Sequence, residues 1–365
     1  MPEAIDRSHL GRQSPAEITV DRALAVAVYR RLLLRRALVV AVAALCVAAA
    51  AAIDLVTGAS NLPVSDLLQG IIDPASLDAV TRVIVWNVRL PYAVMAVMVG
   101  AALALAGAEM QTVLDNPLAS PFTLGVSSAA AVGASLAISF NLVMPGLSAN
   151  WIVSLMAFVF SFGSVLLLQA VSKLAAGGRE TIILLGIALV FTCNAIVALL
   201  QLVAPEDVLQ QLVFWTLGSI ARADWEKVGL LALTLAVVTP FSIGSAWKLT
   251  VLRLGEDRAA SSGVDVRRLR FLSLIRISLL ASISVACVGP IGFVGLVGPH
   301  IARLCVGEDQ RFLLPVSALI GALILSLASV TSKSIIPGVT IPVGIVTALV
   351  GVPLFVVLVL RRGRA

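Results

Sequence analysis

Long apolar segments recur along most of the chain, and each is long enough to cross a lipid bilayer. A helix needs about 20 apolar residues to span the hydrocarbon core, and 59% of the 365 residues are hydrophobic while only 13% are charged. Soluble domains carry about one quarter charged residues. Lipid leaves only helices and closed barrels as spanning structures, and these segments lack the alternation of barrel strands. The sequence therefore predicts an all-α polytopic membrane protein.

We predict about ten transmembrane helices. The eighth is short for a full crossing and rich in glycine, so it is tilted, buried or only partly inserted. The spans are expected at residues 37–53, 92–113, 123–140, 151–172, 181–203, 228–246, 271–288, 292–306, 313–332 and 342–360.

Basic residues are distributed unevenly around these spans. With the N-terminus inside, most of the 26 lysines and arginines fall in cytoplasmic segments or span ends, as the positive-inside rule requires. The exceptions outside are Arg82, Arg89, Arg222, Lys227 and Lys333. This asymmetry explains the net charge of +6 without a nucleic-acid partner. We expect residues 1–36 to form a cytoplasmic tail, too long for the start of a cleaved signal peptide, and residues 37–362 to form the transmembrane domain.

Two segments between spans are expected on the outer side. Residues 54–88 are predicted to form a long loop. Residues 205–225 are too polar to span, but Val208, Leu212 and Trp215 share one face, which favours a short interfacial helix. Inside the spans, small residues recur at helical spacing from Gly100 to Ala108, and we expect them to let helix backbones approach closely.

The sequence contains no motif that could supply energy for transport. A phosphate-binding P-loop needs Gly-Lys-Ser/Thr, and Lys173, Lys227, Lys248 and Lys333, which are all the lysines, never follow a glycine. Proton- or sodium-driven transporters use acidic residues inside their spans, and these are few here, with Glu109 the clearest. The cysteines lie in apolar runs without CxxC spacing, so no metal site is expected. If the chain transports, its energy comes from a partner.

One basic residue, Arg276, lies about one turn inside the seventh predicted span. A charge at such a position either reaches the membrane surface or pairs with an acid from a neighbouring helix. The sequence leaves both roles open.

The longest polar interruption among the spans is residues 249–270. Its pattern predicts a short helix with Glu256 and Asp257 at the N-terminus, where the helix dipole favours acids. Gly263 is placed for a left-handed C-cap, and Asp265 for the N-cap of the next helix. A capped helix in a loop between two spans indicates that something docks on it.

Four segments together resemble the FecCD-type permeases. The resemblance is carried by RLPYAVMAVMVGAALALAGAEMQTVLDNPLASPFTLGVSSAAAVGA at residues 89–134, LGEDRAASSGVDVRRLR at 254–270, VGPIGFVGLVGPHIARLCVGEDQRFLLP at 288–315 and IPVGIVTALVGVPLFVVLVLRR at 341–362. It extends from about residue 80 to 362, and its motifs are specific. The family consists of ten-span subunits of binding-protein-dependent ABC importers for ferric siderophores, haem and cobalamin.

The resemblance implies a type II ABC importer permease of the bacterial inner membrane, with both termini cytoplasmic. A second copy or a paralogue completes a dimer, two ABC ATPase subunits bind ATP and dock beneath it, and a periplasmic or lipid-anchored binding protein delivers the substrate. The chain itself is then a transport subunit in contact with lipid, without a catalytic site or cofactor. A ferric siderophore is the expected cargo, with haem and cobalamin as alternatives.

The resemblance also assigns a partner to the 249–270 segment, which matches the coupling helix that sits in a groove of the ATPase subunit. An ordinary capped loop helix is the alternative. The matching residues are Gly255, Glu256, Ala259, Gly263 and Arg267.

Two further segments match family motifs inside the membrane domain. The turn between the second and third spans matches at Asn116, Pro117, Leu118, Ala119 and Pro121, and a tight chain reversal is its simpler role. The fifth span lines the pathway in the family and opens with Arg179, Glu180 and Thr181. The 173–181 loop is therefore a candidate inner gate, with a Gly-Gly hairpin before a helix as the alternative.

Two basic residues match positions where the family meets its binding protein. Arg89 matches an outer arginine that contacts an acid of the binding protein, and Lys333 occupies a second basic position. Such charge pairs mainly set orientation and association rate, whereas snorkelling to head groups is the structural alternative. The sequence departs from the family pattern at Tyr92, Ser329 and Thr340, which puts the individual docking pairs in doubt.

Two other classes stay open. The chain could be an ion-coupled secondary transporter that works alone, or a membrane scaffold that transports nothing. The 255–267 helix discriminates between them, because only the ABC permease needs it to bind an ATPase.

Overall fold

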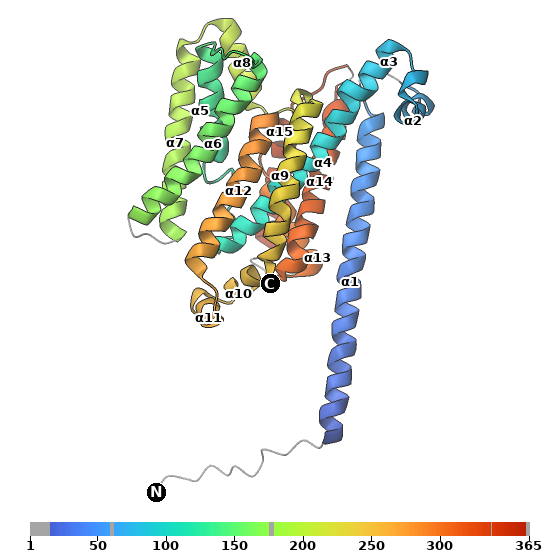
Figure 1. Ribbon diagram of the computed structural model, residues 1–365, viewed down its shortest axis with the longest axis vertical. Helices are drawn as coiled ribbons and strands as arrows, with labels where there is room; N and C mark the ends of the chain where they lie inside the picture. The colour runs from blue at the N-terminus through green and yellow to red at the C-terminus, as the bar shows by residue number, and fades with distance from the viewer. Residues whose placement is uncertain (1–14, 59–61, 175–178, 337, 363–365) are drawn as a thin grey trace.

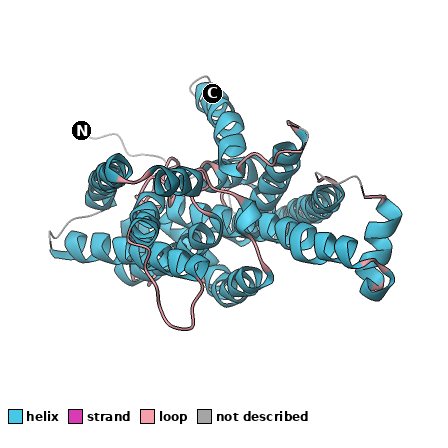
Figure 2. Ribbon diagram, turned by 90° about the horizontal axis from the view of Figure 1, so that it is seen from above, coloured by secondary structure: helices cyan, strands magenta, loops and turns pink. Residues whose placement is uncertain are grey.

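The structure is a computed structural model that describes residues 15–58, 62–174, 179–336 and 338–362. The regular secondary structure of these residues is helical. Their β-type pairing is limited to an isolated bridge between Ile336 and Val339. Figure 2 shows helices joined by loops throughout. The helices are α1 (Pro15–Val56), α2 (Val64–Ile72), η2 (Pro74–Ser76), α3 (Ala79–Val83), η3 (Ile84–Arg89), α4 (Leu90–Val113), α5 (Val126–Ser139), α6 (Ala149–Leu174), α7 (Arg179–Val203), α8 (Glu206–Thr216), η4 (Ile220–Arg222), α9 (Trp225–Gly244), α10 (Ala246–Leu252), α11 (Glu256–Ser261), α12 (Val266–Val288), α13 (Val294–Val306), α14 (Gln310–Ser334) and α15 (Val343–Arg362).

Ten of these helices correspond one to one with the predicted spans. In the described part of the chain, seven segments are long and apolar enough to cross a membrane, and three shorter apolar helices lie in α5, α13 and α15. α13 has 13 residues and rises about 20 Å, less than the hydrocarbon core of about 30 Å. The predicted shortness of the eighth span is confirmed. α5 is also short, because the turn before it continues to Gly125 and the helix begins at Val126.

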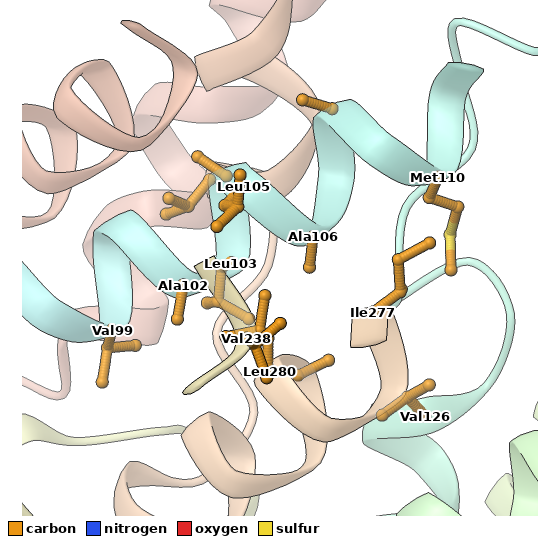
Figure 3. Close-up of a cluster of buried hydrophobic side chains, with 14 of the residues drawn as sticks. Val99, Ala102, Leu103, Leu105, Ala106, Met110, Val126, Val238, Ile277 and Leu280 are labelled. Atoms are coloured by element: carbon orange, nitrogen blue, oxygen red, sulfur yellow. The ribbon is translucent and has the colours of Figure 1, made fainter. Parts of the chain in front are cut away.

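α4 is the centre of the bundle. It packs against α14, α12, α13 and α9, and its residues from Val99 to Val113 are buried except for Ala101. Figure 3 shows Val99, Ala102 and Ala106 of α4 among side chains from neighbouring helices, including Val238 of α9 and Leu280 of α12. A helix that is apolar around its whole circumference belongs in a protein core or a membrane, and α4 is enclosed by its neighbours.

Glycines set how closely the neighbours of α4 approach. A Cβ at Gly100 would lie 2.3 Å from the carbonyl oxygen of Gly321 on α14, and a Cβ at Gly107 would lie 1.8 Å from that of Gly295 on α13. These are backbone contacts that only glycine allows. The predicted close packing through small residues is confirmed.

α1 is one continuous helix of 42 residues. Its buried residues Ala43, Val47, Ala50 and Asp54 lie at helical spacing and form the stripe that packs on α14 and α4. The first half of the helix extends beyond the bundle (Figure 1). The predicted boundary at residues 36 and 37 is therefore not a break in the backbone.

The polar connections gather at two opposite ends of the molecule. Figure 1 shows α2, α3 and α8 at one end and α10 and α11 at the other. α8 buries Leu212 and Trp215, as the predicted one-sided helix requires. Arg222 follows in η4, where its guanidinium donates to the carbonyls of Phe214, Trp215 and Val288, and burial lowers its pKa to about 10.

The expectation of a long loop at 54–88 is wrong, because most of this segment is helical. α2 lies within it, and α3, η3 and α4 run as one helix, Ala79–Val113. Asp78 starts that helix by accepting hydrogen bonds from the backbone N–H groups of Val80 and Thr81, each at 3.1 Å. The π-helical η3 ends at Arg89, two residues before Pro91, whose missing N–H would interrupt an α-helical ladder.

Candidate functional site

The segment between α9 and α12 forms a compact polar corner, built from α10, α11 and the turn after α11 (Figure 1). Gly255 precedes α11 with a φ of 111°, where a side chain would be strained. Glu256 and Asp257 occupy the first turn. Gly263 follows the helix with a φ of 79°. The predicted short helix and its left-handed glycine are confirmed.

Two backbone hydrogen bonds close the C-terminus of α11. The N–H of Val264 donates to the carbonyl of Ala259 at 3.0 Å, and that of Gly263 donates to the carbonyl of Ala260 at 2.9 Å. This is the Schellman pattern. Ala259 and Val264 are both buried. The methyl group of Ala259 therefore packs inside the chain and fixes α11 to the core.

One ion pair attaches α11 to α12, and a separate side chain caps α12. Glu256 Oε1 accepts a hydrogen bond from Arg270 Nη2 at 2.6 Å. Asp265 Oδ1 caps α12 by accepting from the N–H of Arg268 at 2.9 Å, as the sequence predicted. Arg267 is exposed on the first turn of α12. The corner is thus a short helix held rigidly to α12, with charged side chains facing outward.

Behind the corner, polar side chains join the end of α4 to α13 and α10. Arg303 on α13 donates from Nη2 to the fully buried Gln111 at 3.1 Å and from Nε to Glu308 at 3.0 Å. Glu308 also pairs with Arg253, just after α10, at 2.9 Å. This chain of contacts connects the corner to the central helix.

Deeper in the bundle, Glu109 and Arg276 form an ion pair. Glu109 is fully buried on α4, and its Oε1 accepts from Arg276 Nε at 2.9 Å and from Nη2. Ser242 on α9 donates to Glu109 Oε2 at 2.9 Å. The three side chains join α4, α9 and α12. Of the two roles that the sequence left open for Arg276, the structure selects pairing with an acid of a neighbouring helix.

The segment from Asn116 to Pro121 reverses the chain tightly. Asn116 Oδ1 accepts from the N–H of Leu118 at 2.9 Å, and the N–H of Ala119 donates to the carbonyl of Asn116 at 3.1 Å. Ala119 and Pro121 are buried, so the turn is anchored in the bundle while Leu118 is exposed. This geometry fits the turn that the sequence indicated.

The predicted inner gate lies partly outside the described residues, which omit 175–178. α7 begins at Arg179, Glu180 is exposed and Thr181 is partly buried. These positions do not test the gating role, which stays a prediction.

Arg89, expected on the outer docking surface, is buried at the C-terminus of α1. Its side chain donates from Nη1 to the carbonyls of Leu55 at 3.1 Å and Val56 at 2.8 Å, which have no partner within the helix. The guanidinium lies against Gly58, where a Cβ would come within 3.0 Å of Nη2. In this structure Arg89 ties α1 to the helix that carries α4.

Lys333, the second predicted docking residue, binds the same end of α1. Its Nζ lies 2.8 Å from Asp54 Oδ1 and 3.1 Å from the Asp54 carbonyl, and the two side chains are 8% and 0% exposed. Sequence reasoning missed Asp54 because the residue was placed in the outer loop. The one sequence feature that could have indicated its role is that Asp54 is an isolated acid at the end of an apolar run. The docking role of Arg89 and Lys333 stays a prediction.

A model of the FecCD transport family matches residues 38–361. The chain belongs to the FecCD transport family. The matched residues include the polar corner, the Glu109–Arg276 pair and the Asn116 turn. The resemblance that the sequence motifs carried is therefore confirmed.

Relatives of this FecCD permease are named for different substrates. An Fe(3+)-citrate import system permease of Bacillus subtilis is 38% identical over 288 residues, which are 79% of this chain and 85% of the relative. A hemin transport system permease of Yersinia pestis is 35% identical over 279 residues, 76% of this chain and 84% of the relative. Relatives named as vitamin B12 and molybdate import permeases are 36% identical. The chain is an ABC importer permease, and its membership alone selects no substrate.

A solved structure has a similar fold. It is of an ABC transporter assigned to the metal-chelate type, in an inward-facing conformation, and the match covers 88% of this chain and 98% of that one, with 33% identity and a TM-score of 0.77. As a multi-span FecCD permease, the chain is an inner-membrane protein. Its family implies an ATPase subunit, a substrate-binding protein and a second permease chain as partners.

Proposed function

We propose that this FecCD permease translocates an iron chelate, specifically a ferric siderophore, using ATP hydrolysed by its partner subunit. Relatives named for Fe(3+)-citrate and hemin support an iron-containing cargo. Haem and cobalamin are the alternatives within the same class. The observation that carries the coupling part of the proposal is the geometry of α11, a capped helix fixed to α12 and exposed on its outer face.

Each coupling residue has a distinct task in this proposal. Gly255 and Gly263 let the chain enter and leave α11 at positive φ. Ala259 anchors the helix in the core, and Glu256 holds it to α12 through Arg270. Arg267 is exposed and faces the ATPase subunit.

Movement of α11 then reaches the membrane domain through α12. Because α11 and α12 are joined by a salt bridge and by the buried Ala259, a push on α11 displaces α12. Arg276 on α12 carries the displacement to Glu109 on α4. Packed helices joined by ion pairs are a physical route for coupling between distant sites.

The proposal fixes the orientation of the chain. The end that carries α10 and α11 faces the cytoplasm with both termini, and the end with α2, α3 and α8 faces the binding protein. The 173–181 loop serves as the inner gate. Docking through Arg89 and Lys333 is proposed from the family motif, and it requires these side chains to leave their contacts with α1.

Growth of a strain that lacks the permease tests the cargo. Under iron limitation, single purified ferric siderophores are supplied in turn, with hemin as a separate iron source and cobalamin-dependent growth as a separate arm. The proposal predicts loss of growth on at least one siderophore and rescue by the cloned gene. Normal growth on every siderophore, with a defect only on hemin or cobalamin, would identify that alternative as the cargo.

Substitution of Arg267 tests the coupling role separately. Arg267→Glu reverses an exposed charge and leaves the α11 cap and the Glu256–Arg270 bridge untouched. We expect normal membrane insertion but little substrate-stimulated ATPase activity when the variant is reconstituted with its ATPase and binding protein. Wild-type stimulation of the ATPase activity in this variant would show that Arg267 does not contribute to the contact with the ATPase subunit.

A further inference from the structure

A cavity of about 390 Å³ opens beside the polar corner, between the α9–α10 junction and the first turns of α12. Arg268, Leu272 and Arg276 lie four residues apart on α12 and line one wall, because side chains at this spacing share a helix face. Ser245 and Lys248 line the opposite wall. A water occupies roughly 30 Å³, so the cavity has room for a phosphate group and several waters.

The cavity has an excess of positive charge. Arg276, at its deep end, is neutralised by Glu109, and the carboxylate of Asp265 in the lining caps the N–H of Arg268. Lys248 and Arg268 are exposed, and neither side chain forms an ion pair with a described residue. Lys248 and Arg268 therefore line the cavity without an ion-pair partner among the described residues, and the one acid in the lining, Asp265, caps α12.

The surface next to the cavity is apolar. Phe241 lies one turn before Ser245 on α9 and is 65% exposed, and Leu272 of the lining is 42% exposed. Phe271 and Trp247 add further exposed apolar surface. The cavity thus lies where the apolar faces of two membrane helices end and the polar corner begins. A phospholipid has a matching arrangement, because its apolar acyl chains adjoin a negatively charged phosphate.

We propose that this cavity binds the phosphate of an anionic phospholipid. Lys248 and Arg268 contact the phosphate, and the acyl chains lie along Phe241 and Leu272. Basic pockets between membrane helices are a recurrent form of head-group site. Because one wall belongs to α12 beside α11 and the other to the α9–α10 junction, the bound lipid braces the corner. If α11 couples to an ATPase as proposed above, the lipid also tunes that coupling, but the binding itself does not depend on the coupling.

Native mass spectrometry of the permease, purified with its ATPase subunit, tests the proposal. Phosphatidylglycerol is the anionic probe and phosphatidylcholine the matched neutral one. We expect retention of phosphatidylglycerol to weaken roughly 30-fold in the double variant Lys248→Gln/Arg268→Gln, because each basic residue near an anionic head group contributes about fivefold. Arg258→Gln removes an exposed charge of α11 outside the cavity and should retain the lipid.

Three outcomes would overturn the proposal. The first is equal lipid retention by wild type and the double variant. The second is protection against thermal unfolding by inorganic phosphate equal to that by phosphatidylglycerol, which would assign the cavity to a free anion. The third is retention by the permease alone but not with its ATPase, which would assign the cavity to the partner. The charge-conserving Lys248→Arg/Arg268→Lys variant should bind as wild type, so a folding defect cannot be mistaken for lost binding.

Discussion

Arg276 of α12 donates two hydrogen bonds to the same carboxylate oxygen of Glu109, which is fully buried on the central helix α4. The second carboxylate oxygen is held by Ser242 of α9. Three membrane helices therefore meet at one charge pair. A buried pair is strongly destabilised when one partner is removed, because the other charge is left without compensation.

The two partners of this pair should respond unequally to substitution. Glu109 is enclosed on all sides, whereas Arg276 is 12% exposed and lies beside a cavity. Arg276→Met strands a carboxylate, and we expect it to cost about 3–5 kcal/mol. Glu109→Gln leaves an arginine that can turn toward the cavity, so it should cost less. Thermal unfolding in detergent measures both variants.

The double variant Glu109→Gln/Arg276→Met provides the control for that comparison. It leaves no unpaired charge, so it should be more stable than Arg276→Met alone. If both single variants had the melting temperature of the wild type, the pair would contribute nothing to the stability of the bundle.

Close packing at Gly107 gives a second prediction. Gly107→Ala places a methyl group against the carbonyl of Gly295, a backbone atom that cannot move aside. We expect loss of folded protein in the membrane, measured by size-exclusion chromatography of the extracted chain. Gly163→Ala in α6 is the matched control, since a Cβ there meets no atom within 4 Å. Equal yields of both variants would contradict the packing of α4 on α13.

The anchors of α1 give a third prediction, which separates stability from docking. Lys333→Met leaves Asp54 buried without its cation, and we expect it to lower the thermal stability by about 3–5 kcal/mol. Asp54→Asn should cost less, because a freed lysine can extend toward the surface. If Lys333 serves docking alone, its variant would keep the wild-type melting temperature, and its association with the binding protein would be slower and less dependent on salt than that of the wild type.

The Glu256–Arg270 bridge gives a fourth prediction. Glu256 is about half exposed, and exposed pairs contribute up to about 1 kcal/mol, so Glu256→Gln should barely change the melting temperature. Because the bridge fixes α11 to α12, the variant should nevertheless lower the transport achieved per ATP hydrolysed. The exchange Glu256→Arg/Arg270→Glu should restore part of that coupling. A variant with wild-type coupling would show that the bridge transmits nothing.

The sequence predicted the elements that depend on local chemistry. The positions of the ten spans followed from the apolar runs. Gly263 and Asp265 indicated the caps of α11 and α12, because capping is decided by a few neighbouring residues. The Asn116 turn follows from the same kind of signal. Each of these features has its cause within one short stretch of chain.

Contacts between distant residues were much harder to predict. Asp54 pairs with Lys333, 279 positions away, and nothing near either residue indicates the partner. Ala259 matches a family position for partner coupling, yet its side chain is buried inside the chain, because the Schellman turn folds it against Val264. The helical structure of 54–88 was missed because its polar residues, such as Asp78, are helix caps and were interpreted as loop residues.

Substrate accumulation in proteoliposomes tests whether a partner ATPase drives transport through this permease. The permease is reconstituted alone or with its ATPase subunit, with the binding protein, the cargo and ATP supplied on the appropriate sides. We expect accumulation only when both the ATPase subunit and ATP are present, and loss of that accumulation in Arg267→Glu. Accumulation by the permease alone, driven by an ion gradient, would contradict this expectation and favour a secondary transporter.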